Sequence, residues 1–340
     1  MLLQIEDIKE LSLEELSKVL QSWGEPSFHA QQIFAWIYKK KAKDFSAMTN
    51  LPSQLREKLK QNFSLSCLKL RTTLRSSDAT EKFLFELEDG NLIEAVSIPA
   101  EKRITGCVSS QVGCKFACRF CASGAFGFKR NLTTAEILEE VLIFPKVTHL
   151  VFMGTGEPLD NYENVLKAIK IINSAQGLNI GARRITISTS GIIPAIMRLA
   201  EEGLQIELSV SLHAADNQTR DLIMPVNKKY PLKELISTCK EYIRQTNRQV
   251  TFEYILIAGL NSDLQSARNL GTMLKGMNCK VNLIPANPVK ELKVLPPEKK
   301  EILTFKDSLL KSGINVTLRR PRGEDIDAAC GQLRLRHEKG

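Results

Sequence analysis

The sequence predicts an α/β protein, a partial (β/α)6 barrel preceded by a small helical domain and a short β extension. Three patterns lead to this prediction. From residue 104 onward, short β-branched runs alternate with longer amphipathic segments, which is typical of parallel strands joined by right-handed crossover helices. Asp89-Gly90 stands between two strand-like runs and predicts a hairpin turn. Residues 1–64 carry helix-start signals instead of strand alternation, which indicates a separate helical unit.

The helical unit, residues 1–64, is predicted to contain three helices. Ser12 and Glu15 have the spacing of a capping box ahead of an apolar stripe. A second segment, 28–38, is rich in apolar and aromatic residues, and a third runs from 52 to 63. The lysine-rich run 39–43 that follows the second segment could contact nucleic acid. It could equally be a solvated basic face beside a core-facing Trp36.

The β extension, residues 65–103, is predicted to link this unit to the barrel. Its strands are expected at 67–74, 81–87 and 92–98, with the hairpin turn between the last two. By strand periodicity alone, Glu94 in the last strand is an outward-facing charge.

The barrel and its C-terminal tail are predicted to occupy residues 104–340. Strands are expected at 147–153, 184–189, 206–212, 250–257, 280–284 and 315–318. Helices are expected at 134–144, 162–173, 194–202, 232–246, 264–276 and 297–311. These units fall short of a full eight-stranded barrel, so we expect an open one with its active site at the C-terminal strand ends.

Composition limits the classes of protein that fit. A hydrophobic content of 43% in 340 residues can form a substantial core. No apolar run approaches ~18 residues, and the N-terminal residues lack a signal-peptide pattern, so we expect no membrane association and a cytoplasmic location. Eight cysteines are too few for a disulfide scaffold, and we expect them to be reduced. The formal charge of +9 favours a polyanionic partner, although a solvated basic surface would give the same excess.

The most informative motif is a C-x3-C-x2-C loop formed by Cys114, Cys118 and Cys121. Three cysteines can bind a [4Fe–4S] cluster and leave one iron without a protein ligand. An open coordination position is typical of catalytic metal sites. A structural zinc site would need a fourth ligand, for which Cys107 is the nearest candidate. No second C-x2-C pair is present and the four histidines are scattered, so the spacing favours iron and sulfur.

Small and polar residues follow several predicted strands. Gly154-Thr155-Gly156-Glu157-Pro158 comes directly after an apolar strand, where glycines free the backbone to meet a ligand and Glu157 could pair with an ammonium group. The other predicted strand ends of this kind are Ser188–Gly191, Ser211–His213 and Ile284–Pro288. In a barrel, these positions would line one ligand site.

These motifs resemble the radical S-adenosylmethionine superfamily and, within it, the RlmN/Cfr family of RNA adenine methyltransferases. The branch is indicated by three longer strings, Ser109–Cys114 (SSQVGC), Ser211–Ala214 (SLHA) and Gly323–Leu333 (GEDIDAACGQL). The likeness extends over nearly the whole chain, including the helical unit. It implies the radical S-adenosylmethionine form of the partial barrel and an RNA-binding role for residues 1–64.

The resemblance also implies a cofactor site. Cys114, Cys118 and Cys121 would bind a [4Fe–4S] cluster whose open iron chelates S-adenosylmethionine. Positions that contact this cofactor in the family match Gly156, Glu157, Ser188, Ser211, Leu212, His213 and Asn287.

A chemical route follows from the same resemblance, with two S-adenosylmethionine molecules per turnover. The first methylates Cys330, and the second is cleaved to a 5′-deoxyadenosyl radical that takes a hydrogen atom from the new S-methyl group. The resulting carbon radical adds to adenine and forms a protein–RNA adduct. Cys107 would resolve the adduct through a transient disulfide with Cys330, and Glu94 would be the proton acceptor, which reverses its assignment from periodicity.

The implied activity is methylation of adenine carbon-2 in 23S ribosomal RNA, at the peptidyl transferase centre, and also at adenine 37 of transfer RNA. We expect a monomer that receives electrons from a donor such as flavodoxin or ferredoxin. Two alternatives stay open. One is carbon-8 methylation of ribosomal RNA, as in the Cfr branch, which gives antibiotic resistance. The other, of a different class, is a non-catalytic zinc protein that binds RNA.

Overall fold

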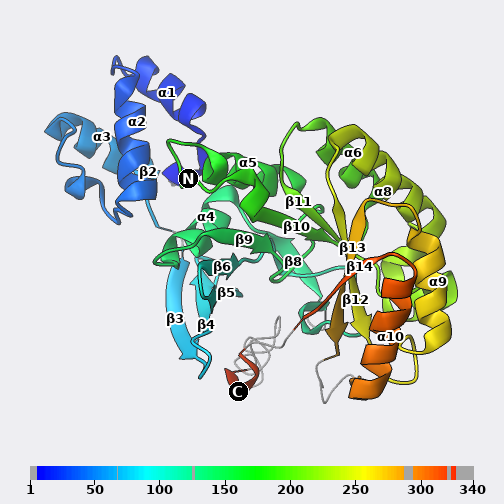
Figure 1. Ribbon diagram of the computed structural model, residues 1–340. Helices are drawn as coiled ribbons and strands as arrows, with labels where there is room; N and C mark the ends of the chain where they lie inside the picture. Colours follow the sequence, from blue (N-terminus) through cyan, green and yellow to red (C-terminus); the bar gives the residue numbers. More distant parts are fainter. Residues whose placement is uncertain (1–5, 67, 125–126, 287–293, 320–322, 327–340) are drawn as a thin grey trace.

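The computed structural model describes residues 6–66, 68–124, 127–286, 294–319 and 323–326. Figure 1 shows a helical N-terminal unit beside a long sheet, with most of the later helices covering one side of that sheet. The barrel helices are α4 (Thr134–Ile143), α5 (Tyr162–Asn173), α6 (Ile193–Glu201), α7 (Asn217–Ile223), α8 (Leu232–Thr246), α9 (Leu264–Leu274) and α10 (Lys299–Lys311).

One ten-stranded sheet runs through the protein in the order β14-β13-β12-β11-β10-β9-β6-β5-β4-β3. Its parallel part consists of β6 (Arg103–Cys107), β9 (His149–Phe152), β10 (Ile185–Thr189), β11 (Glu207–Ser211), β12 (Val250–Leu256), β13 (Cys279–Pro285) and β14 (Asn315–Leu318). Its antiparallel part consists of β3 (Leu68–Arg75), β4 (Glu81–Leu87) and β5 (Leu92–Ala100). Strand β6 joins the two parts, because it pairs antiparallel with β5 and parallel with β9.

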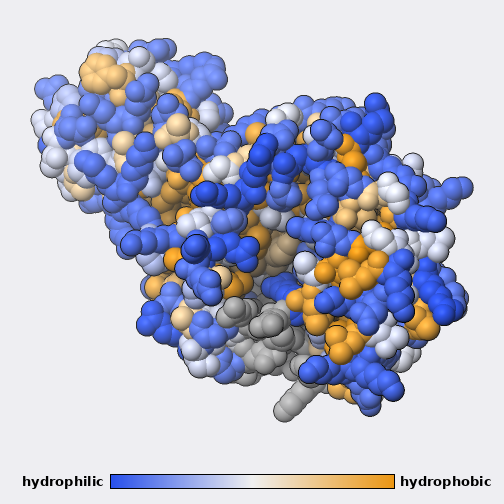
Figure 2. All heavy atoms as spheres, in the orientation of Figure 1, coloured by the Kyte–Doolittle hydropathy of each residue, from blue (hydrophilic) through white to orange (hydrophobic). Residues whose placement is uncertain are grey.

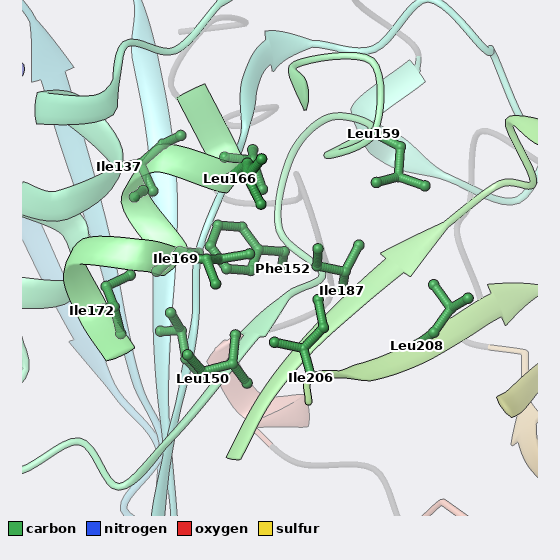
Figure 3. Packing of buried hydrophobic residues seen from close by; sticks show 14 of the residues in the cluster. Ile137, Leu150, Phe152, Leu159, Leu166, Ile169, Ile172, Ile187, Ile206 and Leu208 are labelled. Atoms are coloured by element: carbon green, nitrogen blue, oxygen red, sulfur yellow. The ribbon is translucent and has the colours of Figure 1, made fainter. Parts of the chain in front are cut away.

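The parallel strands have one apolar and one polar face, as a period of two requires. Leu150, Phe152, Ile187 and Leu208 are at most 1% exposed. In Figure 3, Ile169 of α5 lies against Phe152, while Leu208 continues the apolar face on β11, away from α5. This contact buries the stripe that makes α5 amphipathic. The alternate residues of these strands point to the opposite face, away from the helices, and this second face carries the polar groups described below.

The N-terminal unit docks on the barrel through a buried charge. It contains β1 (Glu6–Asp7), η1 (Ile8–Glu10), α1 (Leu13–Ser22), α2 (Phe28–Phe34), η2 (Ala35–Lys39), η3 (Phe45–Ala47), α3 (Ser53–Asn62) and β2 (Phe63–Ser64). Lys9 is 1% exposed, and its ammonium lies 2.8 Å from Asp7 and 3.1 Å from Glu139 of α4. Glu10 in turn accepts the N–H of Ala135, at the start of α4, at 2.8 Å. Removing one partner of such a buried pair is strongly destabilising, so the unit is held in a defined position.

The predicted fold class is confirmed. Every strand and helix predicted for the barrel is present, as are the strands of the β extension and the capping box at Ser12. The sequence did not reveal strand β6, the parallel pair β1–β2, the hairpin of β7 (Gln111–Gly113) and β8 (Phe128–Asn131), or helix α7. Domain boundaries at 64 and 103 stay a prediction.

The molecular surface is mainly hydrophilic on the face shown in Figure 2, with a hydrophobic area over the region of α10. Leu303 and Leu310 of that helix are 43% and 47% exposed. Among the described residues, no helix is both long and apolar enough to cross a bilayer.

Candidate active site

The cysteine loop leaves β7 and returns through β8. Its base is closed by the N–H of Cys114, which donates to Gly127 O at 3.0 Å. Within the loop, Cys121 N–H donates to Cys118 O at 3.0 Å. Gly113 has φ +79°, and a Cβ there would lie 1.8 Å from Gly127 O, so only glycine fits this crossing. The sequence therefore folds the three cysteines onto one short, closed loop.

The chemistry of this loop fits a metal cluster. Burial raises the pKa of the Cys114 thiol to about 12, and the nearby Cys121 adds to the rise. Burial also raises the pKa of Cys118, with further rises from Cys121 and Cys114. Thiolate ligands would therefore repel one another here unless a cationic group binds them, and bound metal supplies that charge.

A single metal ion and a cluster make different demands on the three cysteines. Zinc would draw its cysteine sulfurs to about 2.3 Å from one point. A [4Fe–4S] cluster instead offers a separate iron to each thiolate.

The loop is seated against the ends of strands β11 and β12. The ring of Phe120 meets that of His213 edge-on, with centroids 4.7 Å apart. Phe116, Cys118 and Phe120 pack against a second apolar cluster that includes Ile223 of α7. The N–H of Arg119 donates to Ile223 O at 3.0 Å. Helix α7 thus lies directly beside the cysteines.

The Gly154–Pro158 turn passes very close to the strand that leads into the cysteine loop. A Cβ on Gly154 would lie 2.6 Å from Val108 O, and one on Gly156 would lie 2.6 Å from Gln111 Cβ. Gly156 also has φ +107°, which side chains rarely tolerate. Glu157 N–H donates to Gln111 Oε1 at 2.9 Å. These contacts explain why the turn needs both glycines.

Glu157 is buried, and backbone groups already hold its carboxylate. Its Oε1 accepts from Leu159 N–H at 3.1 Å, and its Oε2 accepts from Ser190 N–H at 2.6 Å. Burial raises the pKa of this carboxyl group, while these hydrogen bonds lower it. The side chain therefore fastens the β9 turn to the end of β10, whether or not it also meets an ammonium group.

His213 is held as a neutral ring of known tautomer. Its Nδ1 accepts the N–H of Ile255 at 3.0 Å, so the ring proton is on Nε2. Burial lowers the pKa of His213 to about 3, and the charge of Arg220 contributes. Its backbone has φ +58°, and Asn261 Nδ2 donates to its carbonyl at 2.7 Å. A neutral imidazole with a fixed Nε2–H can serve as a hydrogen-bond donor beside the cysteine loop.

Arg220 of α7 is a residue that sequence reasoning missed. It is 0% exposed, and its guanidinium donates to the carbonyls of Ser190, Ser211 and Leu212 at 2.7, 3.0 and 3.1 Å. These carbonyls belong to the ends of β10 and β11, where cofactor contacts are predicted. No motif marked the residue, because it lies in a polar stretch that resembles a surface helix.

The polar face of the sheet carries the predicted Ser188 and Ser211 together with groups that had not been singled out. Asn282 Nδ2 donates to Glu253 Oε2 at 2.8 Å, and Thr317 Oγ1 donates to Asn282 Oδ1 at 2.9 Å. This row crosses β12, β13 and β14. Leu212, in contrast, is fully buried: its side chain packs in the core, its N–H donates to Glu253 O at 3.0 Å and its carbonyl accepts from Arg220.

The sheet register places Glu94 and Cys107 on one face. Cys107 pairs with Val96, and Lys82 also pairs with Val96, so the three residues form a row across β6, β5 and β4. Glu94 precedes Val96 by two residues and shares its face. The Glu94 carboxylate is 4% exposed and lies 3.1 Å from the Lys82 ammonium. The prediction from strand periodicity that the Glu94 side chain faces outward is therefore wrong.

Cys107 is a half-buried residue at the end of β6, and its sulfur lies on the enclosed side. Burial raises its pKa to about 11, while Arg319 and Lys82 act in the opposite direction.

Asn287 and Cys330, also predicted as site residues, lie outside the described residues. The segment before Cys330 is placed, since Asp325 accepts from Ser76 Oγ at 2.5 Å and from Ser77 N–H at 3.0 Å in the β3–β4 turn.

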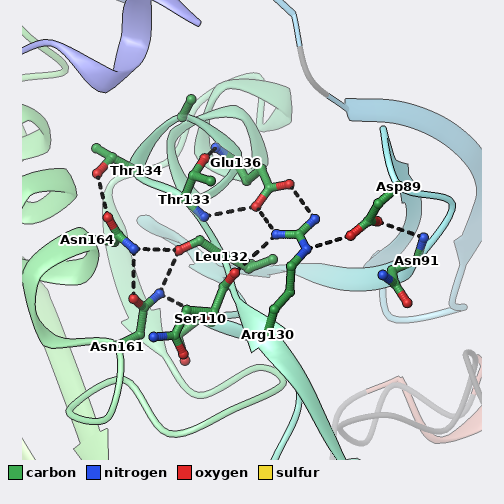
Figure 4. Close-up of polar contacts among 12 residues, drawn as sticks. Asp89, Asn91, Ser110, Arg130, Leu132, Thr133, Thr134, Glu136, Asn161 and Asn164 are labelled. Carbon is green, nitrogen blue, oxygen red and sulfur yellow. Dashed lines mark hydrogen bonds and ion pairs between the residues drawn. The ribbon is translucent and has the colours of Figure 1, made fainter. Parts of the chain in front are cut away.

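A polar network fixes the hairpin that carries the cysteine loop (Figure 4). Arg130 of β8 donates to both oxygens of Glu136 at 2.8 Å and to Asp89 in the β4–β5 turn at 2.5 Å. Asn161 Nδ2 donates to Ser110 O at 2.8 Å and to Leu132 O at 2.7 Å. The loop is thereby tied to the β extension and to α4 and α5.

The curved α/β sheet, the three-cysteine loop and the glycine-rich strand end define a radical S-adenosylmethionine enzyme. Residues 108–269 match the family model described as the radical SAM superfamily. Residues 6–65 match the ribosomal RNA large subunit methyltransferase N-terminal domain.

Two curated relatives specify the family. A probable dual-specificity RNA methyltransferase RlmN of Geobacillus thermodenitrificans is 47% identical over 99% of this chain and 95% of its own length. The protein of the same name from a Thermotoga species is 48% identical over 98% and 99%. The chain belongs to the RlmN family of radical S-adenosylmethionine methyltransferases.

A solved structure agrees. A radical SAM methyltransferase from Sphaerobacter thermophilus is 42% identical, with a TM-score of 0.93 over 96% of this chain and 98% of its own. Family membership implies a [4Fe–4S] cluster and S-adenosylmethionine as cofactors, in agreement with the donor set of the loop.

Proposed function

We propose that this protein methylates carbon-2 of adenine in 23S ribosomal RNA, at the peptidyl transferase centre, and at adenine 37 of transfer RNA. The observation that carries the proposal is the row of Lys82, Cys107 and the neighbouring Glu94 on one face of the sheet. A base and a thiol are thus held together where the strand ends meet the cysteine loop. The names of the relatives, which describe dual-specificity RNA methyltransferases, support the choice of substrates.

Cys114, Cys118 and Cys121 are assigned to the cluster. The cofactor contacts are assigned to Gly156, Glu157, Ser188, Ser211, Leu212, His213 and Asn287. The bound cluster and S-adenosylmethionine supply the radical chemistry, with two cofactor molecules used per turnover. The protein's contribution is to hold these groups in place: Glu157 fixes the strand-end turn, and His213 offers its Nε2–H.

Glu94 is assigned as the proton acceptor and Cys107 as the thiol that forms a transient disulfide with the S-methylated Cys330. Lys82 forms an ion pair with Glu94 at 3.1 Å and holds that carboxylate on the face of the sheet that it shares with Cys107. Cys107 has a raised pKa, so it stays a protonated thiol before the disulfide forms. The two groups thus suit separate steps.

RNA binding is assigned to residues 1–64 and to basic residues near the C-terminus, with residues 65–103 as the link to the catalytic barrel. In the N-terminal unit, Lys40 lies 3.6 Å above the ring of Trp36, and Lys58 lies 4.7 Å above that of Trp23. Paired cations and aromatic rings suit phosphates and unstacked bases. With a formal charge of +9, the affinity for RNA should fall steeply with salt; a salt-independent affinity would oppose this part of the proposal.

Mass analysis of RNA tests the proposal. Anaerobically reconstituted protein is incubated with S-adenosylmethionine, a reductant such as flavodoxin or ferredoxin, and ribosomal or transfer RNA. We expect 2-methyladenine, while 8-methyladenine would support the Cfr-type alternative and no methylated base would overturn both. Colourless protein carrying one zinc would favour the non-catalytic alternative.

The role of Cys107 has its own test. Replacing Cys107 by Ala should trap a covalent protein–RNA adduct, because the disulfide that releases the product cannot form. Cys239, a buried core residue, provides the matched Cys→Ala control, which should release product normally. If the Cys107 variant turns over without accumulating adduct, the assignment fails.

A further inference from the structure

Arg220 is a buried charge for which the assignments above give no role. Besides the three strand-end carbonyls, its guanidinium donates to Asn227 Oδ1 at 3.0 Å and to Tyr230 O at 3.4 Å. All of these acceptors are neutral. A buried arginine usually has a carboxylate partner, since enclosing a charge is costly. Here the hydrogen bonds satisfy the donors without cancelling the charge.

The charge lies next to the cysteine loop. Arg220 and Ile223 lie on the same short helix, and Ile223 O accepts the N–H of Arg119, the residue after Cys118. Cys118 packs against the apolar cluster that contains Ile223. The electrostatic influence of Arg220 reaches Cys118 and opposes that of Cys114, Cys121 and Glu157.

Arg220 stays charged in this setting. Burial lowers its pKa to about 10, and Asp221 and the nearby thiols act in the opposite direction. At neutral pH the guanidinium therefore carries its proton in nearly every molecule. It is a permanent positive charge, shielded from water, on the helix that contacts the cysteine loop.

We propose that Arg220 is a positioning residue of the cofactor site whose fixed positive charge, held beside Cys118, raises the reduction potential of the bound [4Fe–4S] cluster. Reduction adds one electron to the cluster and changes no bond or proton count at Arg220. The electron comes from a one-electron carrier of the flavodoxin or ferredoxin class. Net charge and burial set such potentials, so a buried cation favours the reduced form. The inference rests on the cluster role assigned to the three cysteines.

The first test replaces Arg220 by Gln, which removes the charge, and by Lys, which keeps it. The midpoint potential of each anaerobically reconstituted protein is measured by titration with dithionite, followed by electron paramagnetic resonance. We expect the Gln variant to have a clearly more negative midpoint than wild type, and the Lys variant to lie close to wild type. A purely structural role would not separate two variants by their charge.

A second variant covers the case in which Arg220→Gln does not fold. Asp221 is a partly exposed neighbour whose Oδ1 accepts from Asn227 Nδ2 at 2.7 Å. Asp221→Asn keeps an acceptor there and removes a negative charge near Arg220, so the midpoint should shift to a less negative value. Arg248→Gln is the matched control, because Arg248 pairs with Glu207 at the start of β11 and should leave the midpoint unchanged.

The proposal is overturned if Asp221→Asn does not move the midpoint, or if folded Arg220→Gln retains the wild-type value. Neither measurement involves RNA. Failure to methylate RNA would therefore refute the proposed function and leave this inference standing. Unchanged midpoint potentials in an active methyltransferase would refute this inference and leave the proposed function standing.

Discussion

The ammonium of Lys82 lies 3.1 Å from the carboxylate of Glu94, and the two side chains are 0% and 4% exposed. This buried ion pair joins neighbouring strands of the β extension and faces the same side of the sheet as Cys107. It is the most direct structural link between the extension and the predicted chemistry.

Lys82→Met should destabilise the fold strongly. The substitution removes the Lys82 ammonium from the buried Glu94 carboxylate, and breaking comparable buried pairs costs roughly 3–5 kcal/mol. Urea unfolding measures the loss. Lys18→Met is the control, since Lys18 and Glu14 form an exposed pair, 70% and 79% accessible, whose loss should cost far less than that of the buried pair. Equal small losses in both variants would contradict the importance of burial here.

Glu140 should make the protein less stable as pH rises above about 4.5. Burial raises its pKa well above that ordinary value, so the folded state holds a proton that the unfolded state has released. Glu140→Gln keeps an acceptor for Ser109 N–H and should flatten the decline in unfolding free energy between pH 5 and 8. Glu241→Gln, at a partly exposed surface residue whose pKa is lowered to about 2, should leave the slope in that window unchanged.

His213 should make the protein less stable as pH falls in the acidic range, which is the opposite of the effect of Glu140. Its pKa of about 3 lies below the ordinary 6.5, so between these values the unfolded state binds a proton that the folded state excludes. Stability then falls as pH decreases, by up to about 1.4 kcal/mol per pH unit. His213→Gln, which retains an acceptor for Ile255 N–H, should weaken this dependence in urea titrations from pH 6.5 to 4. An unchanged acid slope would show that the ring titrates freely.

Gly113→Ala should abolish cluster binding while Gly127→Ala largely preserves it. Both residues have positive φ, so both variants carry a similar backbone strain of about 1–2 kcal/mol. Only the Gly113 Cβ collides with backbone, at 1.8 Å from Gly127 O, whereas the Gly127 Cβ meets nothing within 4 Å. Iron and sulfide analysis should give about four of each per chain for wild type and far less for Gly113→Ala. Equal losses of iron and sulfide in the two variants would show that backbone strain alone, and not the collision of the Gly113 Cβ, weakens cluster binding.

Most of the fold could be predicted from the sequence because each barrel unit has its own periodicity. Helices α5 and α8 were predicted to the residue. Helix α7 was not, because seven residues with a buried arginine show no apolar stripe. Its helical form depends on contacts with strand ends that are distant in sequence.

The residues of the candidate site also fall into those that could be predicted from the sequence and those that could not. The cysteines and the glycine-rich turn were found because their spacing has a chemical meaning. Lys82 and Arg220 were missed because a lone charge normally faces water. The register of β4 and β5 shows that Lys82 does not, and the contacts of Arg220 with the ends of β10 and β11 show the same for that residue. Glu94 needed the family resemblance for the same reason.

Strand β6 has a mechanical consequence. Since it is hydrogen-bonded to β5 on one edge and to β9 on the other, Glu94, Cys107 and the first barrel strands move as one body. No hinge separates the base from the thiol. The movement that brings the reacting atoms together during the catalytic cycle must then come from the RNA base or from segments outside the sheet. The sheet itself stays fixed while they move.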